Sequence, residues 1–229
     1  MHNGTKGFVV TIDGAAGTGK SSVARELAHR LGTDCLDTGA MYRAVAVLSI
    51  DFGLDPRGGE ALALAIREKG IRFDWNDDPP TILLGGEDIA RRVRDLDVSG
   101  VVSIVAQQPE IREVLVEQQR AIRELHPLLV TEGRDQGSVV FPDANVRFFL
   151  EAEVAERTRR RVKQLRDAGN TVEDKEIQLD IESRDKLDSS REDGPLICPD
   201  GAIIINTSSL SKEEVVSTME SEVHSRLQA

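Results

Sequence analysis

The most informative segment of the chain is Gly14-Ala15-Ala16-Gly17-Thr18-Gly19-Lys20-Ser21. It matches the pattern G-x-x-x-x-G-K-[ST] at every position, which is typical of loops that hold nucleotide phosphates. Its glycines let the backbone wrap closely, so that several N–H groups point inward at phosphate oxygens. Lys20 can bridge the β- and γ-phosphates, and the Ser21 hydroxyl can ligate Mg²⁺. The loop, extended to Ser22, therefore predicts a site for a nucleoside triphosphate with magnesium.

The residues on either side of this loop predict the strand and the helix that it should join. Phe8–Ile12 is a β-branched apolar run, as expected for a buried parallel strand. Lys20–Leu31 carries apolar residues at helical spacing and is followed by Gly32, a typical helix stop. The positive end of this helix adds to the phosphate cradle.

Strands alternate with helices along the rest of the chain. Short apolar strands are expected at Leu128–Thr131, Val146–Leu150 and Ala202–Asn206, and helices at Pro109–Leu125, Val154–Asp167, Glu173–Leu187 and Lys212–Leu227. This alternation predicts an α/β fold with a parallel sheet core flanked by helices.

One segment departs from that alternation. Residues 71–75 and 81–84 each show two-residue periodicity and are separated by Pro79-Pro80, which predicts a small antiparallel hairpin. We interpret Arg57–Leu96 as an insert on the sheet edge, a lobe that can close over a ligand. An excursion without a ligand role stays open as the alternative.

The amino-acid composition and net charge limit the cellular compartment and the binding partners that can be expected. The 229 residues carry a formal net charge of −11, which disfavours binding to nucleic acid. Cys35 and Cys198 lack metal-type spacing, so we expect buried, reduced thiols. The apolar runs are too short to span a bilayer, and the loop at Gly14 leaves no room for a signal peptide. We therefore expect a cytoplasmic protein with no membrane partner.

Arginines outside the loop favour phosphoryl transfer to a small acceptor. The guanine-reading N-K-x-D pattern is absent after the late strands, which weighs against a GTPase, and the chain is short for a motor ATPase. Asp37–Arg43 is expected to form a short loop leading into a helix. Glu132-Gly133-Arg134-Asp135 follows a predicted strand, which places it at the ligand edge of an open parallel sheet.

A third basic group lies between Arg157 and Arg166. Helical spacing places Arg157, Arg160 and Arg161 on one side and the basic residues at 159, 163 and 166 on another. Phosphoryl transfer needs mainly a clamp of cations, so one or two of these residues are expected to contact phosphate. The others are expected to pair with nearby glutamates in solvent.

Taken together, the motifs identify a resemblance over nearly the whole length. The chain resembles the cytidylate kinase family of nucleoside monophosphate kinases. The residues that carry it are the phosphate loop, LDTGAMYR at 36–43, Ser103 before PEIR at 109–112, EGRDQGSVVFPDA at 132–144, the arginines at 157–161 and RDKLDSSRE at 184–192.

The resemblance implies one domain in three parts: a core (about 7–37, 127–152 and 195–229), a monophosphate-binding lobe with the insert (about 38–126) and a short lid (about 153–194). It also implies site residues. Arg43 and Arg134 would hold the acceptor phosphate. Arg157 and Arg161 would lie near the ATP phosphates. The nucleoside would be contacted by Thr38, Tyr42, Ser103, Arg112 and Asp135 at the base, by Arg184 and Asp188 at the sugar, and by Arg191 on closure.

The chemistry of cytosine agrees with this assignment. Its exocyclic amine is a donor that an aspartate can accept, whereas uracil presents the reverse pattern there. A helix-capping role for Asp135 stays open. The expected reaction is in-line transfer from ATP to CMP or dCMP by a monomer. The alternatives are a kinase of another acceptor, such as UMP, shikimate or a coenzyme A precursor, and a nucleotide-gated binding protein.

Overall fold

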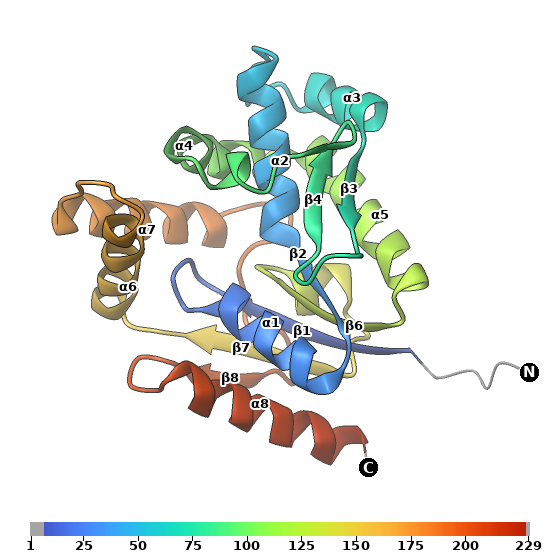
Figure 1. The fold of residues 1–229 in the computed structure, drawn as a ribbon, viewed down its shortest axis with the longest axis vertical. Coiled ribbons are helices and arrows are strands. Elements are labelled where there is room, and N and C mark those ends of the chain that lie inside the picture. The colour runs from blue at the N-terminus through green and yellow to red at the C-terminus, as the bar shows by residue number, and fades with distance from the viewer. Residues whose placement is uncertain (1–6, 228–229) are drawn as a thin grey trace, which may run out of the picture. The chain divides into compact units, whose positions relative to one another are not determined.

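The computed structural model describes residues 7–227 (Figure 1). Its contacts divide the chain into two compact units. The first comprises the residues up to Asp34 together with those from Pro127 onward, and the second is Cys35–His126.

The first unit is built on parallel strands. They are β1 (Phe8–Gly14), β6 (Leu128–Gly133), β7 (Val146–Glu151) and β8 (Ile203–Asn206). The sheet order is β2-β6-β1-β7-β8, with the short edge strand β2 (Asp34–Asp37) at the point where the chain leaves this unit. Val10 of β1 is opposite Val130 on one side and Val146 on the other. This register aligns the carboxyl ends of β1, β6 and β7 at one edge, where ligands bind in open α/β sheets.

Helices cover the central strand of this sheet. All seven residues of β1 are buried, as expected for a central parallel strand. Helix α1 (Lys20–Leu31) packs on β1 and β6, and it also packs against α8 (Lys212–Leu227). Val23 and Leu27, at helical spacing, form its buried stripe.

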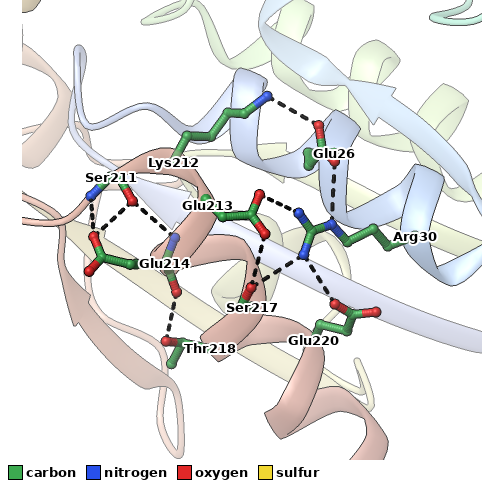
Figure 2. Close-up of polar contacts among 9 residues, drawn as sticks. All are labelled: Glu26, Arg30, Ser211, Lys212, Glu213, Glu214, Ser217, Thr218 and Glu220. Carbon is green, nitrogen blue, oxygen red and sulfur yellow. Dashed lines mark hydrogen bonds and ion pairs between the residues drawn. The ribbon is translucent and has the colours of Figure 1, made fainter.

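An ion-pair cluster joins α8 to α1 (Figure 2). Arg30 of α1 lies 2.6 Å from Glu213 and 3.3 Å from Glu220, both on α8. Lys212 of α8 pairs with Glu26 of α1 at 3.1 Å. The helix that carries the phosphate loop is therefore held to the last helix by charge as well as by apolar packing.

Two further helices and one turn complete the first unit. The π-helical turn η2 (Gln136–Val140) follows β6 closely, and the helices α6 (Val154–Asp167) and α7 (Asp174–Ser189) pack against each other. Helix α6 contains the basic residues between Arg157 and Arg166, and α7 contains Arg184 and Asp188.

The second unit is arranged around one helix. Helix α2 (Thr38–Asp51) is packed by α3 (Gly59–Lys69), α4 (Leu96–Val105), β4 and the short 3-10 turn η1 (Arg92–Arg94). Helix α5 (Pro109–Leu125) packs on α3. A separate antiparallel sheet has the order β3-β4-β5, from β3 (Ile71–Asp74), β4 (Thr81–Leu84) and β5 (Glu87–Asp88).

Most predicted elements are confirmed. The helices at 20–31, 109–125, 154–167 and 212–227 have the expected bounds. The hairpin forms, but it gains a third strand and makes its own sheet instead of extending the main one. The short loop expected over Asp37–Arg43 was wrong, because Thr38–Arg43 already belongs to α2. Strand β2 runs directly into this helix, and the Asp37 carboxylate caps it by accepting from the Ala40 N–H at 3.0 Å.

The expectation for the thiols was partly wrong. Both cysteines are free of disulfides, but Cys198 is exposed and Cys35 only half-buried. As to membranes, none of the helices within residues 7–227 is long and apolar enough to cross one.

Candidate active site

The phosphate loop has the backbone shape that its glycines allow. Gly14, Gly17 and Gly19 have φ values of 150°, 82° and 97°, a region that L side chains rarely adopt. Gly19 is the N-cap of α1 and no side chain caps that helix end. The first N–H groups of α1 therefore have no side-chain cap and can donate to an anion.

Lys20 is buried within the loop. Its Nζ donates to the Ala15 carbonyl at 2.7 Å, and 5% of the residue is exposed. Burial, together with the positive charge of Arg134, lowers the pKa of Lys20 to about 7. A bound phosphate would stabilise the charged form of Lys20 against the cost of burial, so this side chain is suited to binding an anion.

Ser21 meets a carboxylate at the end of β6. Its hydroxyl donates to Glu132 Oε1 at 2.5 Å, and Glu132 is 3% exposed. Within residues 7–227 no group of three or more His, Cys, Asp or Glu residues could hold a metal by itself. Mg²⁺ in kinases needs only one or two protein oxygens beside substrate phosphates and water, so Ser21 and Glu132 fit it.

Asp13 lies immediately before the loop and is fully buried. Its two carboxylate oxygens accept from the backbone N–H groups of Gln136 and Gly137, at 2.8 and 2.7 Å. Burial raises the pKa of Asp13 to about 6, although these two hydrogen bonds oppose the rise. The end of β1 is thus joined to the turn that follows β6.

Arg134, at the end of β6, is held by α7. Its Nε lies 2.8 Å from Asp188 Oδ2, and Arg191 pairs with the other oxygen of the same carboxylate. Burial opposes ionisation of Asp188, but Arg134 and Arg191 keep its pKa below the ordinary value. The structure therefore brings together three of the predicted substrate residues.

Asp135 begins the η2 turn and is 4% exposed. Its side chain makes no cap hydrogen bond, although its backbone carbonyl accepts from Val139 and Val140. The capping role that sequence reasoning left open is therefore wrong for this carboxylate.

Two arginines of α6 brace the phosphate loop from outside. Arg157 donates to the Ala16 carbonyl at 3.2 Å and pairs with Asp185 of α7 at 2.7 Å. Arg160 donates to the Thr18 carbonyl at 3.3 Å and to the Thr207 hydroxyl at 3.0 Å. The helix thus contacts the loop through main-chain carbonyls.

The other basic side chains of this region divide as helical spacing predicts. Arg161 bonds Gln164 at 2.8 Å, and burial lowers its pKa with help from Arg184, which itself pairs with Asp180 at 3.1 Å. Exposed ion pairs engage the remaining three, Arg159 with Glu156, Lys163 with Asp167 and Arg166 with Asp174.

The second unit carries its own set of predicted residues. Arg112 is 1% exposed and donates to the Tyr42 hydroxyl at 3.2 Å. Arg43 donates to Ser99 Oγ at 3.0 Å and to the Val93 carbonyl at 3.2 Å. Thr38 is buried, one turn before Tyr42 on α2, and Ser103 is half-buried on α4. Two polar pairs are therefore preformed within this unit.

A cavity of about 380 Å³ adjoins the phosphate loop at the carboxyl end of β7. It is lined by Ala15, Phe149, Leu150, Glu151, Ala152, Glu153, Leu196 and Asn206. Open volume therefore lies directly beside the cradle.

Three residues of this arrangement were not predicted from the sequence. Asp13, Glu132 and Ser99 were given no role of their own, although Glu132 stands in a quoted motif. A signal existed for Asp13, because a charged residue near the end of a buried apolar strand is rarely left without partners. Arg160 was grouped with Arg157 on one helix face, but its contact with the Thr18 carbonyl was not predicted.

The fold and this site define a P-loop kinase. Comparison with solved structures agrees on the fold: a shikimate kinase from Bacteroides thetaiotaomicron superposes with a TM-score of 0.50, covering 97% of this chain and 99% of that one at 13% identity.

Within that class the family is clear, because the family model for cytidylate kinase matches residues 10–225. A cytidylate kinase from Caldanaerobacter subterraneus subsp. tengcongensis is 43% identical over 207 residues, 90% of either chain. One from Mycolicibacterium paratuberculosis is 39% identical over 218 residues, 95% of this chain and 96% of the relative. The chain belongs to the cytidylate kinase family, and it is a nucleoside monophosphate kinase.

Proposed function

We propose that the protein transfers the γ-phosphoryl group of ATP to CMP and dCMP, giving ADP with CDP or dCDP, by direct in-line displacement. The supporting observation is that one unit joins the phosphate loop to the Glu132–Asp135 segment: Ser21 bonds Glu132, and Asp13 bonds the turn that starts at Asp135. The residues that bind the phosphoryl donor and those that bind the acceptor are thus connected to each other, which favours transfer between bound reactants.

In this proposal the protein contributes positioning and charge. The backbone of Gly14–Ser22 and the Lys20 ammonium hold the β- and γ-phosphates, and Arg157 and Arg161 approach them from the lid. No protein base is required, because the acceptor phosphate is already ionised at neutral pH. Arg157 must exchange its contact with Asp185 for one with phosphate, so lid movement would accompany binding.

Ser21 and Glu132 would hold Mg²⁺ in the loaded enzyme, Glu132 directly or through water. The ion supplies charge neutralisation on the β- and γ-phosphates. The protein keeps these two oxygens together, and their short hydrogen bond fixes the Ser21 rotamer.

The acceptor is recognised by two sets of residues. From the first unit, Arg134 contacts its phosphate and Asp135 reads the cytosine edge. From the second unit, Arg43 contacts the phosphate and Ser103 and Arg112 read the cytosine edge, with Thr38 and Tyr42 beside the base. Arg184 and Asp188 contact the sugar, and Arg191 helps to close the site. The preformed Arg112–Tyr42 and Arg43–Ser99 bonds support this proposal, since oriented side chains lose less entropy on binding.

The test is ADP release from Mg-ATP with a panel of acceptors: CMP, dCMP, UMP, AMP, GMP and shikimate. Fast turnover with CMP and dCMP, weak turnover with UMP and none with the others is expected. If UMP matches CMP, the assignment of Asp135 and Arg112 to the cytosine edge is wrong, although the kinase remains. If no acceptor stimulates ADP release, phosphoryl transfer itself is refuted and a nucleotide-gated binding role replaces it.

A further inference from the structure

Asp13 is a buried carboxylate that the proposed reaction does not use. It is the last residue but one of β1, its side chain is fully shielded from solvent, and the next residue, Gly14, begins the phosphate loop. Both of its oxygens are engaged by backbone amides, Gln136 N–H at 2.8 Å and Gly137 N–H at 2.7 Å. A carboxylate held in this way is poorly placed to accept a proton from substrate.

The turn that Asp13 holds is packed on its other sides as well. The Thr131 hydroxyl donates to the buried Gln136 side chain at 2.9 Å. A Cβ on Gly137 would lie 2.8 Å from Thr11 Oγ1 and 3.0 Å from Pro199 Cγ. The position of this turn is therefore narrowly defined. Asp13 accepts two charge-assisted hydrogen bonds from it, which are stronger than bonds between neutral groups.

Arg134 and Asp135, the residues proposed to meet the acceptor, immediately precede this turn, and Asp135 is its N-cap. A shift of the amides at 136 and 137 would move the Asp135 carboxylate and the end of β6. The Asp13 main chain, in turn, continues into Gly14. The single side chain of Asp13 therefore connects the start of the phosphate loop to the η2 turn.

We propose that Asp13 is a positioning residue, whose two hydrogen bonds fix the Arg134–Asp135 segment against the phosphate loop and so set acceptor affinity and base choice. This inference rests on the proposed acceptor role of Arg134 and Asp135. It assigns Asp13 no contact with substrate.

The test compares Asp13→Asn and Asp13→Ala with the wild type at pH 8. Asparagine keeps the shape and one acceptor oxygen, but it turns an amide NH₂ toward a backbone N–H; alanine removes both bonds. Because misplacement by about 1 Å can cost about 100-fold in rate, we expect kcat/KM for CMP to fall about 10-fold in the first variant and further in the second. The preference for CMP over UMP should fall in the same order. Mg-ATP affinity, measured by titration without acceptor, should change less than about threefold.

A matched control is Asp88→Asn in the second unit. Asp88 Oδ1 also accepts a backbone N–H, from Ala90 at 2.8 Å, but its side chain is exposed. This variant should retain wild-type kinetics with both nucleotides. A fall in the CMP preference in this variant would overturn the proposal.

Asp135→Ala separates the inference from the proposed function beneath it. If Asp135→Ala loses the CMP preference and Asp13→Asn keeps it, Asp13 has no positioning role. If neither changes it, the acceptor role of the turn is wrong. Equal weakening of CMP and ATP in Asp13→Asn, or a lower Tm with unchanged kinetics, also overturns the proposal.

Should the Asp13 variants fail to fold, Gly137→Ala carries the same test with Asp13 intact. Its added methyl must push the turn away from Thr11. It should raise KM for CMP and leave Mg-ATP binding within about threefold. Unchanged KM for CMP would show that the placement of the turn does not control the acceptor.

Discussion

Replacing Gly14 by alanine should destabilise the first unit through one close contact. Gly14 is paired with Leu150 at the end of β7, and a Cβ built on it would lie 2.3 Å from the Leu150 carbonyl oxygen. Carbon–oxygen contacts normally stay above about 3.3 Å, so β1 and β7 would have to separate by about 1 Å there. The residue also has a φ of 150°, which L side chains rarely adopt.

The two penalties can be added. An unfavourable backbone conformation costs about 1–3 kcal/mol and overpacking about 1–3 kcal/mol. The free energy of unfolding should therefore fall by about 2–6 kcal/mol, which is a substantial fraction of the roughly 5–15 kcal/mol that is usual for a domain. For a chain of this size that corresponds to a Tm lower by roughly 5–20 °C.

The matched control is Gly32→Ala. Gly32 has a φ of 62°, also in the left-handed region, but its added Cβ would meet nothing within 4 Å. This change should cost only about 1–2 kcal/mol. Urea unfolding followed by far-UV circular dichroism would measure both variants, with Mg-ATP titration of each folded protein. If Gly14→Ala is as stable as Gly32→Ala and binds Mg-ATP equally well, the contact with Leu150 does not position the phosphate loop.

Three further predictions concern charged groups. Lys20→Ala should lower kcat at least about 100-fold and leave Tm unchanged or higher, since it removes a desolvated ammonium; near-normal ADP release would refute the role of the loop. Asp188→Asn should raise KM for CMP about tenfold, because Arg134 and Arg191 lose their ionic partner and can move. Steady-state kinetics would measure this change, and an equal rise in KM for ATP would contradict the prediction. The third concerns Asp13, whose pKa burial raises from the ordinary 3.8 to about 6. Its contribution to stability is therefore complete below pH 4 and is lost as pH rises through 6. The difference in free energy of unfolding between wild type and Asp13→Asn should thus shift against the wild type by about 3 kcal/mol between pH 4 and pH 7; urea titrations that give a constant difference would refute the burial effect.

Local patterns predicted the elements that have strong local signals. The phosphate loop has glycines where the backbone needs a positive φ, and α1 ends at Gly32, which adopts the left-handed conformation. Helix α5 begins at Pro109, a favoured first helical residue. In these cases the residue type itself indicates the local conformation, because glycine permits a positive φ and proline fixes φ near the helical value.

Elements that depend on distant partners were missed. Strand β2 is only Asp34–Asp37 and two of its four residues are acidic, so its strand conformation comes from its place in the sheet. The same holds for β5, whose Glu87 and Asp88 are exposed and are defined by pairing with β4. Two-residue strands carry no periodicity from which they could be predicted.

The candidate site divides in the same way. Roles for the arginines of the quoted motifs are implied by the family resemblance, and they stay predictions. Their present partners could not be predicted from the sequence. That Arg134 pairs with Asp188, 54 positions later, follows from the packing of α7 near the end of β6. That Ser21 meets Glu132 follows from the register between β1 and β6.

These partners explain how an acidic chain keeps an anion site ready. Isolated buried cations are costly, and without a counter-charge they lose their proton or draw in water. Here Asp188 pairs with Arg134 and Arg191, and Glu132 lies near enough to raise the pKa of Lys20 against the effect of burial. When phosphates bind, they therefore replace these carboxylates as the counter-ions of the cations. The cations themselves need little rearrangement. Carboxylates in this site thus serve phosphate binding by holding the cations in position beforehand.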